Sequence, residues 1–187
     1  MNDELLRLYD EARKVYPDRV FVPGEGDVRA RVVLIGEAPG ENEETQRRPF
    51  VGKAGENLND FLCLSGIRRD ELFITNAVKI RPVKTGKSGR NINRPPMRAE
   101  IDAFRPYLLK ELEIIKPLVA VTLGNVPLLA LGGKSIKIGS VHGSFIQTEG
   151  LLIYPMYHPA SVIYNRSLAS VYAEDTRLLG EWIKQNA

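Results

Sequence analysis

The stretch Arg31-Val-Val-Leu-Ile-Gly36 decides the fold of this chain. A short run of β-branched and aliphatic residues that ends at a glycine is typical of a strand buried on both faces. Further short apolar runs occupy 72–75, 118–122 and 151–154. Apolar residues recur at helical spacing over 4–15, 56–65, 97–116, around 127–131 and over 168–184. Strands that alternate with helices favour a parallel sheet covered on both faces, so we expect a three-layer α/β/α sandwich with a central, mostly parallel four-stranded sheet.

The composition bounds the class of protein. The chain has 187 residues, 43% of them hydrophobic and 26% charged, which suits one globular domain spanning 1–187. No apolar run approaches the roughly 20 residues that span a bilayer, and the acidic start lacks the features of a signal peptide, so we expect a cytoplasmic monomer. A single cysteine, Cys63, excludes an intrachain disulfide, and its place in a predicted helix favours a buried thiol.

The positive charge is concentrated in one stretch. The net charge is only +3, but between Lys79 and Arg98 there are seven basic residues and no acidic one. Glycine, serine and proline are frequent there. The stretch is compatible with a solvated loop of incidental charge and equally with a loop that follows backbone phosphates.

Polar and glycine-rich segments follow each predicted strand. In parallel sheets ligands bind beyond the carboxyl ends of the strands. The segments at those ends are Gly36-Glu-Ala-Pro-Gly40 with Pro49-Phe-Val-Gly-Lys-Ala-Gly55, then Asn76-Ala-Val-Lys79, Leu123-Gly-Asn125 and His158-Pro-Ala160. No Gly-Lys-Ser/Thr closes a phosphate-binding loop, and the glycine triplet of a dinucleotide fingerprint is missing.

Taken together, these segments resemble the uracil-DNA glycosylase superfamily, most closely its family-4 enzymes. Four motifs in order, each at the end of a strand, carry the resemblance over nearly the whole chain. The resemblance implies a DNA repair enzyme that flips uracil out of DNA and hydrolyses its N-glycosidic bond, leaving an abasic site.

The residue types at three of these positions suit that chemistry. A base attacked by an enzyme must leave the stack and enter a pocket. Phe50 offers a flat apolar surface for stacking, and the Asn76 amide both donates and accepts at the base edge, where cytosine reverses the pattern of uracil. His158 is a hydrogen-bond donor for the negative charge on departing uracil. The alternatives are a core phenylalanine, a helix-capping asparagine and a structural histidine.

The resemblance places further residues at the pocket. Glu37 is expected to be catalytic, either by orienting water or by stabilising an oxocarbenium-like sugar. The better-known branch of the superfamily has an aspartate one position later, where this chain has Ala38, so the role of that aspartate does not transfer directly. The remaining substrate-binding candidates are Gly36, Ala38, Glu43 and Asn93, with Asn91 as a competitor for the position of Asn93.

The DNA-binding candidates come from three segments. The basic stretch supplies Lys79, Arg81 and Lys84, for which we prefer phosphate contacts to Schiff-base chemistry. His142 is a candidate for a phosphate contact or a residue of a turn. Ser161, Val162 and Ile163 follow the His-Pro-Ala motif, and Val162 or Ile163 would fill the stack that the base vacates, unless both pack under the final helix.

The chain departs from the family in one respect. The resemblance implies a four-iron, four-sulfur cluster on four cysteines, but Tyr9, Ala12, Ile80 and Phe104 stand at those positions. One cysteine cannot replace four thiolates, so we expect no such cluster and no other cofactor. We hypothesise that these four side chains form an apolar plug between the first helix, the basic stretch and the long helix.

Two alternatives to uracil excision stay open. One is a non-catalytic nucleic-acid-binding protein that kept the fold. The other is a glycosylase for another deaminated base, such as hypoxanthine.

Overall fold

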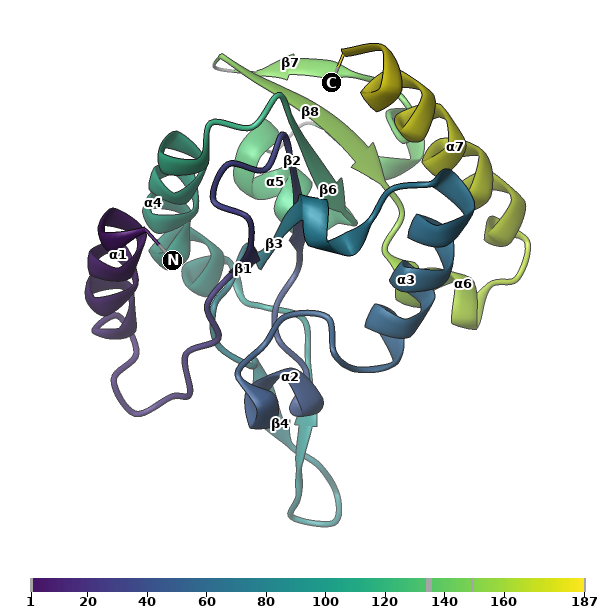
Figure 1. Ribbon diagram of the computed structural model, residues 1–187. Helices are drawn as coiled ribbons and strands as arrows, with labels where there is room; N and C mark the ends of the chain where they lie inside the picture. Colours follow the sequence, from purple (N-terminus) through teal and green to yellow (C-terminus); the bar gives the residue numbers. More distant parts are fainter. Residues whose placement is uncertain (1, 134–135, 149, 187) are drawn as a thin grey trace.

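A computed structural model describes residues 2–133, 136–148 and 150–186 and confirms the α/β class. A six-stranded sheet with the order β1-β3-β2-β6-β8-β7 runs through the middle of the molecule (Figure 1). Its strands are β1 (Glu25–Gly26), β2 (Val32–Gly36), β3 (Leu72–Asn76), β6 (Val119–Leu123), β7 (Ile146–Thr148) and β8 (Leu151–Met156). The four central strands are parallel, as predicted, and the short edge strands β1 and β7, which were not predicted, pair antiparallel.

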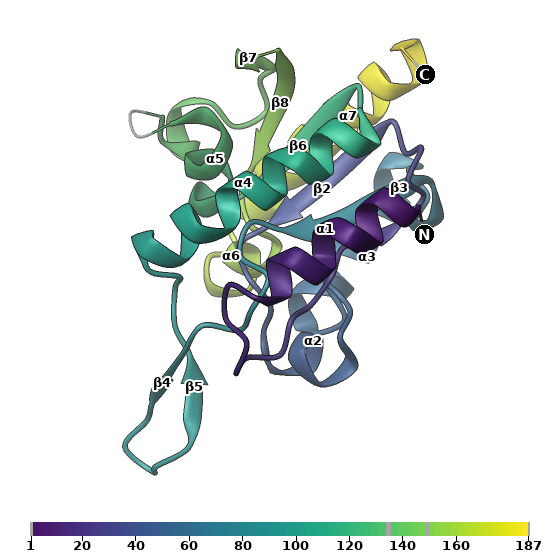
Figure 2. The same ribbon diagram turned by 90° about the vertical axis from the view of Figure 1, so that its left-hand side faces the viewer.

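Helices cover both faces of this sheet. One layer contains α1 (Asp3–Arg13), α4 (Arg98–Ile115) and α5 (Asn125–Gly132), and the other contains α3 (Lys53–Ser65), α6 (Pro159–Tyr164) and α7 (Leu168–Asn186) (Figures 1 and 2). The five predicted helices are confirmed, with ends that shift by a few residues. The short helices α2 (Glu41–Gln46) and α6 were not predicted. None of the helices in the described ranges has the length and apolar character that a bilayer span requires.

Each central strand contributes to two cores because successive side chains point to opposite faces. Val33 and Ile35 of β2 pack with α1, α4 and α5 in one cluster. Val32 and Leu34 of the same strand pack with α3 and α7 in the other. This two-sided burial explains why the strand sequences are continuous apolar runs.

The basic stretch forms a hairpin instead of an irregular loop. Strand β4 (Val83–Thr85) pairs antiparallel with β5 (Asn91–Asn93) in a separate two-stranded sheet. Figure 2 shows this hairpin projecting away from the body of the molecule.

Candidate functional site

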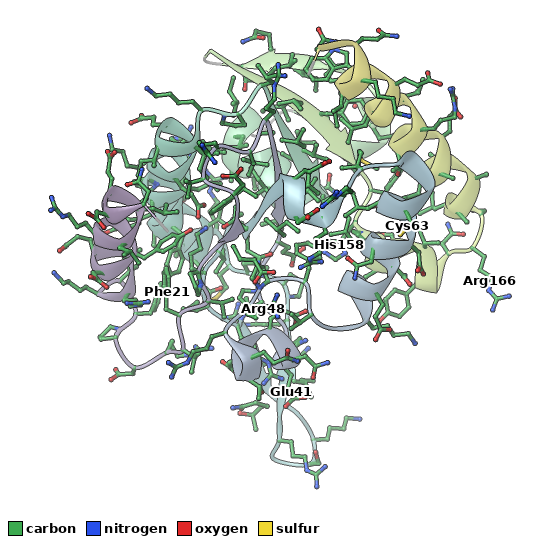
Figure 3. All side chains as sticks on the ribbon, in the orientation of Figure 1. Phe21, Glu41, Arg48, Cys63, His158 and Arg166 are labelled. Carbon is green, nitrogen blue, oxygen red and sulfur yellow. The ribbon has the colours of Figure 1, made fainter. Side chains whose placement is uncertain are left out.

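A cavity of about 350 Å³ lies beyond the carboxyl ends of β2 and β3. It is bounded by the segments after these strands, by the first residues of α2 and α3, and by the start of α6. Figure 3 shows His158 near the middle of the molecule, with Glu41 of α2 on the side of the projecting hairpin. The lining residues are Ala38, Gly40, Glu41, Asn42, Glu43, Phe50, Gly52, Lys53, Ala54, Asn76, Asn93 and His158.

Phe50 is held in the cavity by a tight backbone. Its φ of 53° lies in the left-handed region, which is costly for an aromatic residue. A Cβ atom on Gly55 would overlap the Phe50 carbonyl, and one on Gly36 would lie 2.6 Å from the Phe50 ring. The ring is 6% exposed and faces the His158 ring, with centroids 6.2 Å apart and planes inclined by 27°. The two glycines therefore make room for a stacking surface.

Asn76 ends β3 directly opposite Gly36 in the sheet register. The residue is 4% exposed, and a side chain on Gly36 would overlap its Oδ1 atom. Within the described ranges the protein makes no hydrogen bond to the Asn76 amide, which leaves a donor and an acceptor facing the cavity.

His158 precedes α6 and caps its amino end. Its Nδ1 atom accepts a hydrogen bond from the backbone N–H of Ala160 at 3.1 Å. Burial lowers the pKa of the imidazole to about 4, against a smaller opposing effect of Glu43. The ring is therefore neutral near pH 7, and because Nδ1 is an acceptor the remaining proton lies on Nε2. The geometry makes His158 a neutral hydrogen-bond donor.

Glu43 connects the two loops that form the cavity wall. One carboxylate oxygen accepts from the backbone N–H groups of Val51 (3.1 Å) and Gly52 (2.8 Å), and the other from that of Gly40 (3.1 Å). The side chain lines the cavity, but its contacts with the protein are those of a loop-positioning residue. Substrate binding by Glu43 stays a prediction.

Of the two candidate asparagines, Asn91 and Asn93, the structure places only Asn93 at the cavity. Asn93 lines the cavity, and Asn91 does not. The Nε of Arg81 donates to Oδ1 of Asn93 at 2.7 Å, and the same guanidinium pairs with Glu44 of α2 at 3.2 Å. Arg81 is 6% exposed, so the prediction that it contacts DNA is wrong. Its hydrogen bonds instead fix an amide at the cavity.

Glu37 is half-buried and lies beside the cavity, outside the set of lining residues. Burial raises the pKa of its carboxyl. Gly36 and Ala38 flank it, and Ala38 lines the cavity. The catalytic role of Glu37 stays a prediction.

The structure contradicts the prediction that Lys79 contacts DNA. Lys79 is 1% exposed, and its Nζ lies 2.6 Å from a carboxylate oxygen of Glu111, which is fully buried. Thr75 and Tyr9 also donate hydrogen bonds to that carboxylate. The charge of Lys79 is therefore matched inside the protein, and the network joins β3 to α1 and α4.

The positions aligned with the cluster cysteines lie together in the core. Tyr9, Ala12, Ile80 and Phe104 are each at most 2% exposed and belong to one cluster. None has a thiolate, so the residues present do not fit an iron–sulfur cluster. The plug they form is less apolar than hypothesised, because the Tyr9 hydroxyl bonds to the buried Glu111.

The segment after His158 forms α6. Val162 is half-buried against the core, and its insertion into the vacated stack stays a prediction; the side chain of Ile163 lies outside the described residues. Tyr164 is 88% exposed at the end of α6, a feature that only the structure reveals. Figure 3 shows the nearby Arg166 pointing outward. Ser161 is half-buried, and its contact with DNA stays a prediction.

Two further residues differ in environment from what their sequence suggests. The Nδ1 of His142 lies 2.9 Å from a carboxylate oxygen of Asp175, and the side chain remains 28% exposed, so a phosphate contact stays a prediction.

Cys63 is exposed, which contradicts the expected buried thiol. The core-facing side of α3 carries Leu58 and Leu62, and one residue farther along the helix turns away from it.

Sequence reasoning missed several residues of the cavity wall. Lys53 and Ala54 belong to the quoted Pro-Phe-Val-Gly-Lys-Ala-Gly motif, and Asn42 follows Gly40 by two positions. Their place within or next to the motifs was the available signal.

The amino-acid sequence matches known proteins of one superfamily over most of its length. The family model of the uracil DNA glycosylase superfamily matches residues 23–179. A type-4 uracil-DNA glycosylase of Saccharolobus solfataricus is 38% identical, over 96% of this chain and 86% of the relative. One of Thermotoga maritima is 39% identical, over 88% and 83%, and a type-5 enzyme of Pyrobaculum aerophilum is 31% identical, over 80% and 70%. The chain belongs to the uracil DNA glycosylase superfamily.

Proposed function

We propose that this protein is a uracil-DNA glycosylase that binds DNA, takes a flipped uracil into the cavity and hydrolyses its N-glycosidic bond. The observation that carries the proposal is the meeting of the Phe50 ring, the Asn76 amide and the His158 imidazole in one cavity. The superfamily membership and the names of the relatives support the same activity. Water is the nucleophile, and the product is an abasic site.

Base recognition follows from two of these side chains. The uracil ring stacks on Phe50, since a flat apolar surface offsets part of the lost base stacking. The Asn76 amide donates to one atom of the base edge and accepts from its neighbour, a pattern that cytosine cannot match. A bound base with the wrong donor and acceptor pattern, such as cytosine, would leave the buried Asn76 amide without hydrogen-bond partners, at a cost of about 1–3 kcal/mol.

His158 stabilises the leaving group. Cleavage leaves negative charge on the uracil, and a fixed hydrogen-bond donor lowers the energy of that charge. The hydrogen bond from Ala160 to Nδ1 holds the ring in the tautomer that carries the proton on Nε2. Glu37 is proposed to orient the attacking water or to stabilise the positive sugar, because it directly precedes Ala38, which lines the cavity.

We further propose that the reaction needs no iron–sulfur cluster. The support is chemical: the chain has one cysteine, and the aligned positions are filled by Tyr9, Ala12, Ile80 and Phe104. Iron in stoichiometric amount, or visible absorption of a cluster in the purified protein, would overturn this proposal.

The test of activity is excision of uracil from a labelled oligonucleotide, followed by alkaline cleavage of abasic sites. Wild-type protein should cut the uracil substrate, and the variants Asn76→Ala and His158→Ala should lose the activity while they remain folded. No cleavage at high protein concentration with DNA binding retained would favour a non-catalytic binder. Cleavage of a hypoxanthine substrate in preference to the uracil one would favour the other glycosylase.

A further inference from the structure

The hairpin of residues 83–93, called the arm below, is a paired two-stranded element that projects from the body of the molecule (Figure 2). Strands β4 and β5 pair through three residues each, and the N–H of Gly86 donates to the carbonyl of Arg90 at 2.8 Å across the turn. Gly89 supplies the positive φ of 77° that the turn requires. The arm is therefore a defined projection with a fixed base and a fixed tip.

The base of the arm is anchored beside the cavity. Asn93, the last residue of β5, lines the cavity and accepts a hydrogen bond from Arg81. The guanidinium of Arg94 donates to the carbonyl of Val83 at 3.0 Å and pairs with the buried Glu100 at 2.7 Å. These contacts hold both strands of the arm in a fixed relation to the cavity.

The basic residues of the stretch divide into two groups. Those near the body are paired with carboxylates, as Lys79–Glu111, Arg81–Glu44, Arg94–Glu100 and Arg98–Asp102. Those in the arm are Lys84, Lys87 and Arg90, which are exposed and have no carboxylate partner among the described residues. Within the basic stretch, unneutralised positive charge is thus found only in the arm, and no acidic residue lies near it in the sequence.

The register assigns the arm two faces. Thr85 and Asn91 are cross-strand partners on the same face as Asn93, because side chains alternate along a strand. Lys84 and its partner Ile92 lie on the opposite face. Apart from Val83 at its base, the face that continues from the cavity is therefore polar, and it leads to the turn that carries Lys87 and Arg90.

We propose that the arm binds backbone phosphates of the DNA on one side of the flipped nucleotide, with Lys87 and Arg90 as the principal contacts. The inference rests on the proposed function for the position of that nucleotide. Asn93 and Gly89, at the tip, are four positions apart in the chain, which spans at most about 13 Å at ~3.3 Å per residue. At ~3.4 Å of helix axis per nucleotide the tip reaches about four phosphates from the cavity.

The first test measures the salt dependence of binding to an undamaged duplex of about 20 base pairs, which requires no uracil excision. The double variant Lys87→Ala/Arg90→Ala should make the slope of the logarithm of the binding constant against log salt less negative by about 1.8. The matched control Arg29→Ala/Arg31→Ala removes the same charge from exposed residues before β2, at the end of the sheet opposite the cavity, and should leave the slope unchanged. Equal slopes for the wild type and the arm variant would overturn the proposal.

The second test locates the contact on the DNA. Uracil substrates are shortened on one side at a time, from about eight to about two nucleotides. Wild-type excision efficiency should fall when one side, and only that side, has fewer than about four phosphates, whereas the arm variant should be insensitive to that truncation. The same loss in both proteins would overturn the proposal. If the protein does not excise uracil but the arm variant still lowers the salt slope, the proposed function fails and the phosphate contact stands.

Discussion

The rings of Phe50 and His158 face each other across 6.2 Å in the wall of one cavity, although the two residues are 108 positions apart in the chain. One ring is apolar and the other carries a single hydrogen-bond donor. The pair therefore combines a stacking surface with a polar group that can reach the edge of a bound base.

Protonation of His158 should be visible in stability. The unfolded chain takes up this proton near pH 6.5, but the folded chain does so only near pH 4. Between these values the unfolded state binds more protons, so the free energy of unfolding falls as the pH is lowered, by about 3 kcal/mol in total. Urea unfolding of the wild type and of His158→Gln at both pH values measures this decrease in the free energy of unfolding, which the variant should not show. The only other histidine provides the control: His142→Gln should show the same decrease as the wild type. Parallel losses in wild type and His158→Gln would contradict the burial of a neutral ring.

Gly36→Ala should abolish excision without removing any polar group. The new methyl would overlap Oδ1 of Asn76 and lie 2.6 Å from the Phe50 ring, so both base-binding side chains must shift. We expect excision to fall by at least about 100-fold, the scale of losing one fixed hydrogen-bond donor. Gly139→Ala is the control, because its methyl would meet only the Tyr157 hydroxyl at 3.7 Å. Full activity of Gly36→Ala would show that the cavity is not the base pocket.

Removing the ammonium group of Lys79 should destabilise the protein. Lys79→Met leaves the Glu111 carboxylate buried without its partner, which costs about 3–5 kcal/mol. The double variant Lys79→Met/Glu111→Leu should recover part of this loss, because no charge is then buried alone, although the Tyr9 and Thr75 hydroxyls lose their acceptor. Chemical denaturation measures both. The salt dependence of DNA binding should be unchanged in the double variant, and a lower slope there would restore Lys79 as a phosphate contact.

Tyr164→Ala should affect duplex DNA more than single strands. An exposed aromatic side chain at the end of α6 can fill the space that the flipped base leaves, and only a duplex imposes the full cost of unpairing and unstacking. We expect excision from duplex DNA to fall by about 10-fold or more while single-stranded excision changes little. Leu118→Ala serves as the control, since Leu118 is 40% exposed at the opposite end of β6. Equal losses on both substrates would exclude insertion by Tyr164.

Local sequence patterns were enough to predict the four parallel strands, the five main helices and the segments that meet at the cavity. The reason is local: a strand buried on both faces needs a continuous apolar run, and a covering helix needs apolar residues on one side. Phe50, Asn76 and His158 were identified because each lies in a recognisable segment at or beyond a strand end, and the order of parallel strands brings those ends together.

The environments of the charged and exposed side chains, in contrast, depend on contacts between distant parts of the chain. Lys79 and Lys87 belong to the same basic stretch, yet one is buried against Glu111 and the other is exposed in the turn of a hairpin. The partner of Lys79 lies 32 residues away, so no local pattern reveals the pairing. Likewise, Val162 and Tyr164 differ in burial because α6 rests on the core along one side only. Whether a charge is available to DNA thus depends on which distant residues the fold places beside it.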